Sequence, residues 1–312
     1  MIPFNKRSLI LAPMAGITDS GFRKICRKYG ADVTVSEMVS SKGIFYGDKK
    51  TNALLKYDEQ ECPIIIQIFG HDTECMKKAA EYVSSFYSPI AIDINMGCPA
   101  PKIFQNGDGC ALMKNHELAY DVIQSVKNNT DLPVSVKFRA GINENCICAV
   151  EFAKTCEQAK ADFITVHGRT REQFYSGQSD KNIIRDVVNA VSIPVIANGD
   201  VFDKASADDI LEYTGAHSAM IGRASLGLPT VFSKIKGVEI TDSIFDIALE
   251  HLSLICLDKP EHVAVKEFRK HLIWYFKGIR NAAEYKRIAS CVVTVSDCKK
   301  LLESVKKDNS GI

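Results

Sequence analysis

Short apolar runs alternate with stretches of helical periodicity along the first 240 residues. Runs such as Ile64-Ile65-Ile66 are continuously apolar, which is typical of parallel strands covered on both faces. The predicted strands are 9–12, 32–36, 63–69, 90–94, 133–138, 162–166, 194–197 and 218–221, and the helices that follow them are 20–29, 49–56, 73–86, 116–128, 145–158, 182–190, 204–213 and 229–236. Eight successive strand–helix units predict an α/β fold of the (β/α)8 TIM-barrel type, whose usual length is about 250 residues.

An open, doubly wound sheet is the main alternative to the barrel. It usually has fewer strands, and it often carries an early glycine-rich nucleotide turn that this sequence lacks. After about residue 240 the strand rhythm stops, and apolar residues such as Leu249, Leu252 and Ile255 recur at helical spacing. We therefore predict a barrel over residues 1–240 and a smaller all-helical domain over residues 241–312, with residues 308–312 disordered.

Cysteine usage and hydropathy limit the class of protein. No run reaches the ~18 apolar residues of a membrane helix. The eleven cysteines are scattered, and no Cys-x-x-Cys occurs, which argues against a disulfide framework, a zinc site or an iron–sulfur cluster. We expect a cytoplasmic, monomeric protein without a metal ion.

Basic residues are concentrated near the C-terminus. Residues 245–312 hold 12 Lys and Arg against 9 Asp and Glu, and within residues 266–287 the numbers are seven against two. Such clustering suggests contact with a polyanion, although a solvated helix face is the commoner reason for a run of charge.

A cysteine follows the fourth predicted strand in the segment Asn95-Met96-Gly97-Cys98-Pro99. The residue before a proline is held out of the helical region, so Cys98 has an extended and fixed backbone. Gly97 leaves room beside it for a flat ligand or another part of the chain. The segment predicts a thiol placed for chemistry. The alternative is that Cys98 is only a small buried side chain, as most free cysteines are.

The other predicted strands also end in polar residues or glycine. In a barrel these ends meet at one mouth, where the active site lies. The residues at the strand ends are Pro13, Met14, Ala15, Glu37, Gln67, Asn95, Cys98, Lys137, Arg139, His167, Arg169, Asn198, Gly199, Asp200, Gly222 and Arg223. Each has an ordinary structural explanation alone, but together they predict a site, with a phosphate held after strands seven and eight.

Four motifs in these positions resemble those of the tRNA-dihydrouridine synthases, and most closely the bacterial branch called DusB. The motifs are Ala12-Pro13-Met14-Ala15-Gly16-Ile17-Thr18-Asp19, Asp93-Ile94-Asn95-Met96-Gly97-Cys98-Pro99, Val166-His167-Gly168-Arg169-Thr170-Arg171 and Ala197-Asn198-Gly199-Asp200. The resemblance covers the barrel nearly end to end, and the basic helical segment also fits it.

The resemblance implies a barrel that binds FMN, NADPH as the reductant and a helical domain that binds tRNA. It implies reduction of the uracil C5=C6 bond, with hydride from the reduced flavin to C6 and a proton from Cys98 to C5. The residues implied to hold the flavin are Pro13, Met14, Ala15, Gln67, Lys137, His167, Asn198, Gly199, Asp200, Gly222 and Arg223. The residues expected to contact the RNA are Asn95, Lys102, Arg139, Arg169, Arg171, Arg269, Lys270 and Arg280, whereas Trp274 is expected in the core.

Two other functions remain possible at this point. One is an FMN enzyme that acts on a free pyrimidine, such as a dihydroorotate or dihydropyrimidine dehydrogenase, but a small substrate needs no basic helical surface. The other is a non-catalytic RNA-binding barrel, and the retained set of Cys98, Lys137, His167 and Arg223 argues against it.

Overall fold

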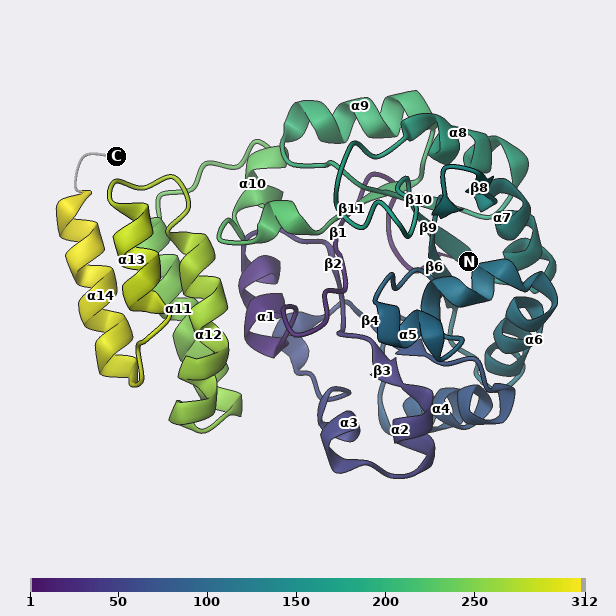
Figure 1. The fold of residues 1–312 in the computed structure, drawn as a ribbon, viewed down its shortest axis with the longest axis horizontal. Coiled ribbons are helices and arrows are strands. Elements are labelled where there is room, and N and C mark those ends of the chain that lie inside the picture. The colour runs from purple at the N-terminus through teal and green to yellow at the C-terminus, as the bar shows by residue number, and fades with distance from the viewer. Residues whose placement is uncertain (1, 310–312) are drawn as a thin grey trace.

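The computed structural model describes residues 2–309 of the chain, and its centre is a closed parallel barrel (Figure 1). The barrel strands are β1 (Leu9–Leu11), β2 (Val33–Val35), β4 (Ile64–Phe69), β5 (Ala91–Asn95), β6 (Val134–Arg139), β9 (Phe163–His167), β10 (Val195–Asn198) and β11 (Ser218–Ile221). Strand β1 pairs with β11 and with β2, and β2 pairs with β4, which closes the sheet. The predicted TIM barrel is confirmed, and the strands are buried as their apolar runs require.

Helices surround this barrel in the order expected of repeated strand–helix units. They are α1 (Ser20–Lys28), α4 (Thr73–Phe86), α6 (His116–Lys127), α7 (Ala149–Gln158), α8 (Lys181–Ala190), α9 (Lys204–Thr214) and α10 (Val231–Ile235). Between β2 and β4 the chain also forms β3 (Val39–Ser40), α2 (Ser41–Phe45), α3 (Lys49–Ala53) and the short helix η1 (Glu59–Glu61). Aspartates at 19, 72, 180 and 203 cap the first turns of α1, α4, α8 and α9, which explains where these helices begin.

One predicted helix starts later than its pattern suggested. The segment before α7 forms a small antiparallel hairpin of β7 (Gly141–Asn143) and β8 (Cys146–Ile147). Gly141 lies so close to the carbonyl group of Cys146 that a β-carbon would collide with it. A hairpin with only two or three residues in each strand is too short to show an alternation from which the sequence could have predicted it.

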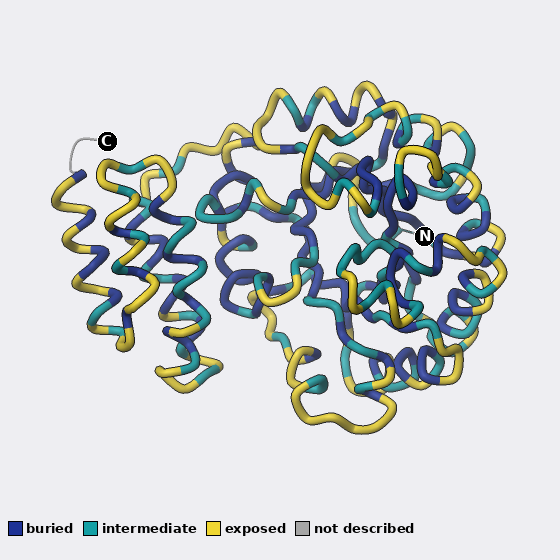
Figure 2. Tube along the Cα trace, in the orientation of Figure 1, coloured by how far each residue is buried: buried dark blue, intermediate teal, exposed yellow. Residues whose placement is uncertain are grey.

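Four helices follow the barrel and pack side by side: α11 (Ile244–Asp258), α12 (Glu261–Tyr275), α13 (Ala282–Ala289) and α14 (Val295–Asp308) (Figure 1). A β-carbon on Gly21 of α1 would lie 2.6 Å from Cγ1 of Ile255, so this glycine lets α1 and α11 approach closely. Buried residues of both parts, such as Phe22 and Leu252, belong to one continuous core. Figure 2 shows buried segments in the barrel and in the helical bundle. The helical C-terminus is confirmed, while a domain boundary near residue 240 stays a prediction.

The end of the last helix is more ordered than expected. The backbone N–H of Arg280 donates to Oδ1 of Asn309 at 3.0 Å, and the Tyr285 hydroxyl donates to Asp308. Asp308 and Asn309 are therefore held by the helical bundle. The rest of the segment predicted to be disordered, residues 310–312, lies outside the described residues. Across residues 2–309 no helix combines the length and the apolar character needed to span a membrane.

Candidate active site

A cavity of about 810 Å³ opens at the mouth of the barrel. All eleven residues predicted to hold a cofactor line it: Pro13, Met14, Ala15, Gln67, Lys137, His167, Asn198, Gly199, Asp200, Gly222 and Arg223. Cys98, Asn95, Arg139 and Arg169 line it as well. The structure thus brings the strand ends together as the sequence predicted, although the role of each residue stays a prediction.

Backbone contacts hold Cys98 at the edge of this cavity. Oδ1 of Asn95 accepts the N–H groups of Gly97 at 3.1 Å and of Cys98 at 2.9 Å, and the carbonyl oxygen of Cys98 accepts the N–H of Cys110 at 3.2 Å. Burial raises the pKa of the Cys98 thiol above its ordinary value, although the charge of Arg139 acts in the opposite sense. The thiol is therefore protonated at neutral pH, which suits a proton donor rather than a nucleophile.

A chain of hydrogen bonds on the cavity floor orients two amides. Nδ2 of Asn95 donates to Oε1 of Gln67 at 2.9 Å, and Nε2 of Gln67 donates to Oδ2 of Asp93 at 2.7 Å. The Ser135 hydroxyl donates to the other Asp93 oxygen at 2.5 Å. Asp93 thereby fixes which face of Gln67 and Asn95 is offered to a ligand. The sequence analysis missed Asp93 as a functional residue, although a lone acidic residue inside an apolar strand was a signal for it.

Two ionisable side chains that line the cavity, Lys137 and His167, influence each other electrostatically. Burial, followed by the charge of Arg139, lowers the pKa of Lys137 to about 8. Burial, followed by the charge of Lys137, lowers the pKa of His167 well below its usual value, so its imidazole is neutral. Nη1 of Arg169 lies 3.5 Å from Nε2 of His167. Lys137 can therefore take up a proton when a ligand brings negative charge into the cavity. His167 presents a neutral ring to the same ligand.

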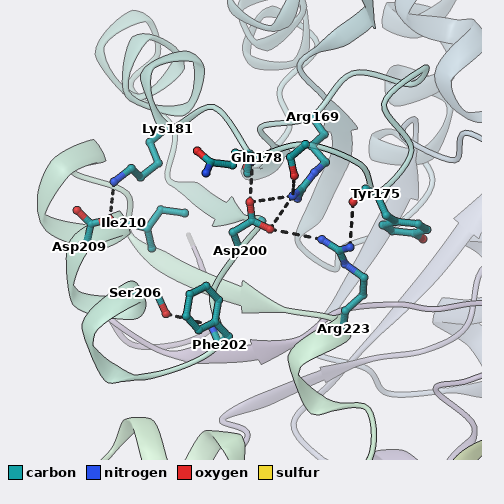
Figure 3. A pocket seen from close by; sticks show the side chains of 13 residues that line it. Arg169, Tyr175, Gln178, Lys181, Asp200, Phe202, Ser206, Asp209, Ile210 and Arg223 are labelled. Carbon is teal, nitrogen blue, oxygen red and sulfur yellow. Dashed lines mark hydrogen bonds and ion pairs between the residues drawn. The ribbon is translucent and has the colours of Figure 1, made fainter. Parts of the chain in front are cut away.

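A second cavity, of about 500 Å³, adjoins the mouth at the ends of β9 to β11 (Figure 3). Both cavities are lined by Arg169, Tyr175, Gly199, Asp200, Phe202 and Arg223. The Asp200 carboxylate accepts Nη2 of Arg169 at 2.7 and 2.8 Å and the N–H of Ser179 at 2.7 Å, and Nη2 of Arg223 lies 3.4 Å away. Asp200 thus positions two arginines, while the Arg223 side chain keeps 46% of its surface exposed. A phosphate here would meet Arg223 and backbone N–H groups rather than the Asp200 side chain.

Two of the residues predicted to contact RNA, Arg139 and Arg169, are buried at the cavity. Arg139 is 3% exposed, and it donates to the carbonyl oxygens of Gly97, Thr170 and Phe174 at 2.9–3.0 Å. Arg169 is 1% exposed, and besides its pairing with Asp200 it donates from Nε to the carbonyl oxygen of Ser176 at 3.0 Å and from Nη2 to that of Gly177 at 2.7 Å. These bonds tie both arginines to the cavity wall, and a contact of either with RNA stays a prediction.

The other predicted RNA contacts lie outside the large cavity, apart from Asn95. Lys102, on α5 (Pro101–Gln105), and Arg280, after α12, are exposed. The Arg171 guanidinium lies 3.8 Å from the centre of the Phe104 ring. Nε of Arg269 donates to the carbonyl oxygen of Val292 at 2.8 Å. The Lys270 ammonium group donates to the carbonyl oxygen of Gly16, which joins α12 to the loop after β1.

Trp274 lines the large cavity, although the sequence analysis placed it in the core. It is half-buried, and Lys277 after the end of α12 lines the cavity with it. Phe174 and Tyr175, which follow β9, cover the cavity from another side. The helical segment therefore completes the mouth of the barrel, and no residue spacing could reveal that, because it depends on how α12 docks.

The sequence profile of the family described as "Dihydrouridine synthase (Dus)" matches residues 10–310. The chain belongs to the dihydrouridine synthase family. It is 37% identical to tRNA-dihydrouridine synthase B of Pseudomonas aeruginosa over 287 residues. This match covers 89% of this chain and 86% of the relative. It is 34% identical over 310 residues to tRNA-dihydrouridine synthase B of Vibrio cholerae, with 96% and 95% covered. These matches confirm the family and the oxidoreductase class predicted from the motifs.

Solved structures of other proteins share the barrel of this dihydrouridine synthase. The structure of TcOYE with pHBA superposes with a TM-score of 0.55 at 11% identity, over 73% of this chain and 88% of that one. Histamine dehydrogenase from Rhizobium sp. 4-9 superposes with a TM-score of 0.53 at 12% identity, over 80% of this chain and 48% of that one. At such low identity the likeness establishes the fold alone.

Proposed function

We propose that this chain, as a tRNA-dihydrouridine synthase, binds FMN in the cavity at the barrel mouth and uses NADPH to reduce uridines of tRNA. The observation that carries the proposal is the single cavity that gathers Cys98 with the eleven predicted cofactor residues. The free-pyrimidine alternative accounts for the cavity but not for the helical segment that completes its mouth through Trp274 and Lys277.

The shape and chemistry of the cavity fit a flavin phosphate. Its volume of about 810 Å³ lies within the range of small-molecule and cofactor sites, ~300–1,000 Å³. Pro13, Met14 and Ala15 give one apolar side, and Gln67 offers an oriented amide. At the far end, Gly199 and Arg223 face the adjoining cavity, where a phosphate would meet N–H groups and a guanidinium.

Each of the residues has a task that follows from its setting. A bound reduced flavin supplies the hydride for C6 of the uracil ring. Cys98 holds the proton that C5 requires, because burial keeps its thiol protonated. Lys137, whose pKa is lowered to about 8, stabilises negative charge in the cavity when it is protonated. Asn95, held by Gln67, is placed to orient the base beside the thiol.

The tRNA must extrude its target uridine to reach this cavity. Extrusion of a base costs a few kcal/mol as an order of magnitude. Phosphate contacts from exposed cations such as Lys102, Lys277 and Arg280 can offset this cost. Trp274 at the mouth offers a ring for stacking. We expect one copy of the chain to suffice and the reaction to take place in the cytoplasm.

The proposal is tested with purified protein, NADPH and unmodified tRNA. We expect a flavin absorption spectrum and the formation of dihydrouridine, measured by mass spectrometry of the digested tRNA. Cys98→Ala should retain the flavin and lose about 10²–10⁴-fold in turnover. Cys146→Ala, which removes an exposed thiol, is the matched control and should turn over normally.

Three results would contradict the proposal or part of it. Oxidation of NADPH with a free pyrimidine but not with tRNA would indicate the small-substrate enzyme. A protein that binds tRNA but cannot be reconstituted with FMN would indicate a non-catalytic RNA-binding barrel. Normal turnover by Cys98→Ala would remove this thiol from the mechanism.

A further inference from the structure

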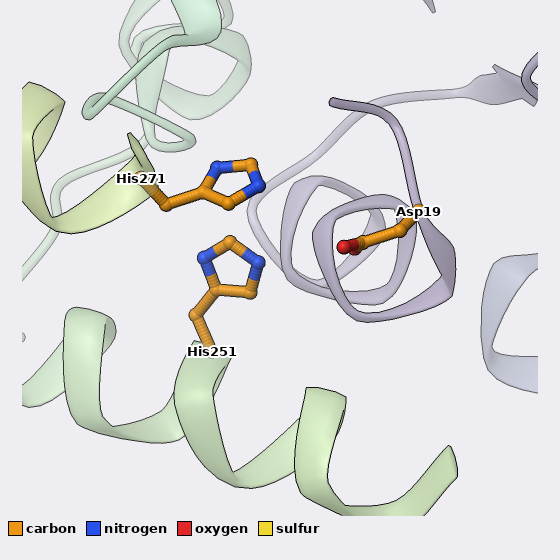
Figure 4. A group of neighbouring side chains, drawn as sticks. All are labelled: Asp19, His251 and His271. Atoms are coloured by element: carbon orange, nitrogen blue, oxygen red, sulfur yellow. The ribbon is translucent and has the colours of Figure 1, made fainter. Parts of the chain in front are cut away.

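Three potential metal ligands meet where the helical bundle packs on the barrel (Figure 4). Asp19 precedes α1, His251 belongs to α11 and His271 to α12. One ligand atom of each lies within 4.8 Å of those of the others. The residues are 6%, 0% and 1% exposed, respectively. In Figure 4 the Asp19 carboxylate points toward the two imidazole rings.

Several polar atoms of this cluster are not satisfied by the described part of the protein. Among the described residues, Oδ2 of Asp19, Nε2 of His251 and both ring nitrogens of His271 have no hydrogen-bond partner. Burial of an unpaired polar group is destabilising, so four such atoms in one place need an explanation. A bound cation would satisfy one atom of each residue at once.

The remaining atoms of two of these residues are held in the way that metal ligands are held. Nδ1 of His251 lies 3.1 Å from the Tyr275 hydroxyl, which leaves Nε2 free for a ligand. Oδ1 of Asp19 accepts the N–H of Phe22 at 2.9 Å, which leaves Oδ2 free. In metal sites the second nitrogen of a ligating histidine is commonly hydrogen-bonded, because this fixes the tautomer and the ring orientation.

The charges around the cluster are compatible with a cation. The Lys259 ammonium lies 3.8 Å from Oδ2 of Asp19, but it is also paired with Glu267 at 2.5 Å. The nearby Lys270 donates to the Gly16 carbonyl oxygen.

We propose that Asp19, His251 and His271 form a binding site for a divalent transition-metal ion, with Zn²⁺ as the expected occupant. Two imidazoles and one carboxylate are ligands that Zn²⁺ accepts, and a water molecule can take the fourth position. The inference goes beyond the dihydrouridine synthase activity, and it departs from the metal-free protein expected from the cysteine pattern. It rests on histidines far apart in sequence, which no spacing motif connects.

The site has a structural consequence for the active-site mouth. It would join the start of α1 to α11 and α12, which come from opposite ends of the chain. The ring of His271 makes an edge contact, 5.4 Å between centres, with Trp274, which lines the large cavity. A metal at this position would therefore fix the helical bundle against the barrel and hold Trp274 in place.

The test measures metal binding to the tag-free full-length protein after treatment with EDTA. Zn²⁺ is added, excess is removed, and the bound metal is counted by mass spectrometry, with Co²⁺ as a visible-absorption probe of the ligand set. We expect one ion per chain and a higher melting temperature with Zn²⁺. Asp19→Asn keeps the helix cap, because asparagine caps as well as aspartate. Asp19→Asn and His271→Gln should each weaken binding by on the order of 100-fold or more.

A histidine on the same helix provides the control. His262 is exposed on α12, so His262→Gln should bind Zn²⁺ as the unchanged protein does. Circular dichroism identifies any variant that has lost its fold. The proposal is wrong if the folded, unchanged protein takes up neither Zn²⁺ nor Co²⁺, or if folded Asp19→Asn and His271→Gln keep full affinity. Neither readout requires activity on tRNA, so this test is independent of the proposed function.

Discussion

Gly109 determines how closely the chain can pack behind the Cys98 thiol. Its φ is +59°, in the left-handed region that favours glycine. A β-carbon at this position would lie 2.9 Å from Cβ of Cys98 and 3.0 Å from its carbonyl oxygen. The loop after the cysteine motif therefore supports the thiol from behind. Glycine is required at this position because a β-carbon would collide with Cys98.

Replacing this glycine should move the thiol without removing it. Gly109→Ala should retain flavin but lower turnover by about 10–100-fold, because misplacement of a reacting group by about 1 Å has effects of this size. Gly47→Ala is the control, since its φ is +67° and no atom lies within 4 Å of its added β-carbon. Both variants should lose about 1–2 kcal/mol of stability from backbone strain. The measurement is the turnover of tRNA uridine by each variant. Equal turnover by Gly109→Ala and Gly47→Ala would show that the position of Cys98 does not depend on Gly109.

Most residues of the candidate site could be predicted because they occupy strand ends, and strand ends follow from the apolar pattern. Gln67, Lys137 and His167 were located in this way. Trp274 could not be located, because its exposure to the cavity depends on the docking of α12 rather than on its own periodicity. The burial of Arg169 was unpredictable for a similar reason, since its partner Asp200 comes from a different strand end.

At the scale of elements, the loop after β11 is pressed directly against α12. Gly227 has a φ of +69°, and a β-carbon there would collide with the carbonyl group of Trp274 and lie 2.8 Å from the N–H nitrogen of Tyr275. The contact is between backbones, so neither side can give way by changing a rotamer. It fixes the distance between the last barrel loop and the helix that completes the cavity.

Gly227→Ala should therefore destabilise the protein beyond the cost of backbone strain alone. We expect a loss of about 2–4 kcal/mol in the free energy of unfolding, against about 1–2 kcal/mol for Gly237→Ala. Gly237 has a φ of +72° and no atom within 4 Å of an added β-carbon, which makes it the matched control. Urea unfolding followed by circular dichroism compares the two. Similar losses would mean that the loop can move away from α12 at little cost.

Element order was predictable, whereas the contacts between distant elements were not. Continuous apolar strands such as β4 and capped helices such as α4 carry their signals within a few residues. The close approach of α1 and α11 depends on Gly21 and Ile255, which are more than two hundred residues apart. Nothing local marks such a pair, so the seam between barrel and bundle had to come from the structure.

At the scale of the whole molecule, exposed positive charge lies on both the barrel and the helical bundle. Lys102 is on α5, directly after the Cys98 segment, and Arg280 follows α12 in the helical part. A tRNA that places one uridine in the cavity must extend beyond it, and its phosphates can then meet cations from both parts of the chain. The two residues therefore test whether barrel and bundle bind the RNA together.

Lys102→Ala and Arg280→Ala should each reduce the salt dependence of tRNA binding. Each lost phosphate contact lowers the slope of log affinity against log salt concentration by about 0.7–0.9, because fewer counterions are released. Lys154→Ala is the control, since Lys154 lies on the outer helix α7 and is paired with Glu151. Binding is measured by fluorescence anisotropy at several salt concentrations, and flavin content and thermal stability should not change. If the slope falls for only one of the two variants, the tRNA contacts only one part of the chain, and a binding surface shared by barrel and bundle is excluded. If the slope falls equally for Lys154→Ala, the binding is non-specific.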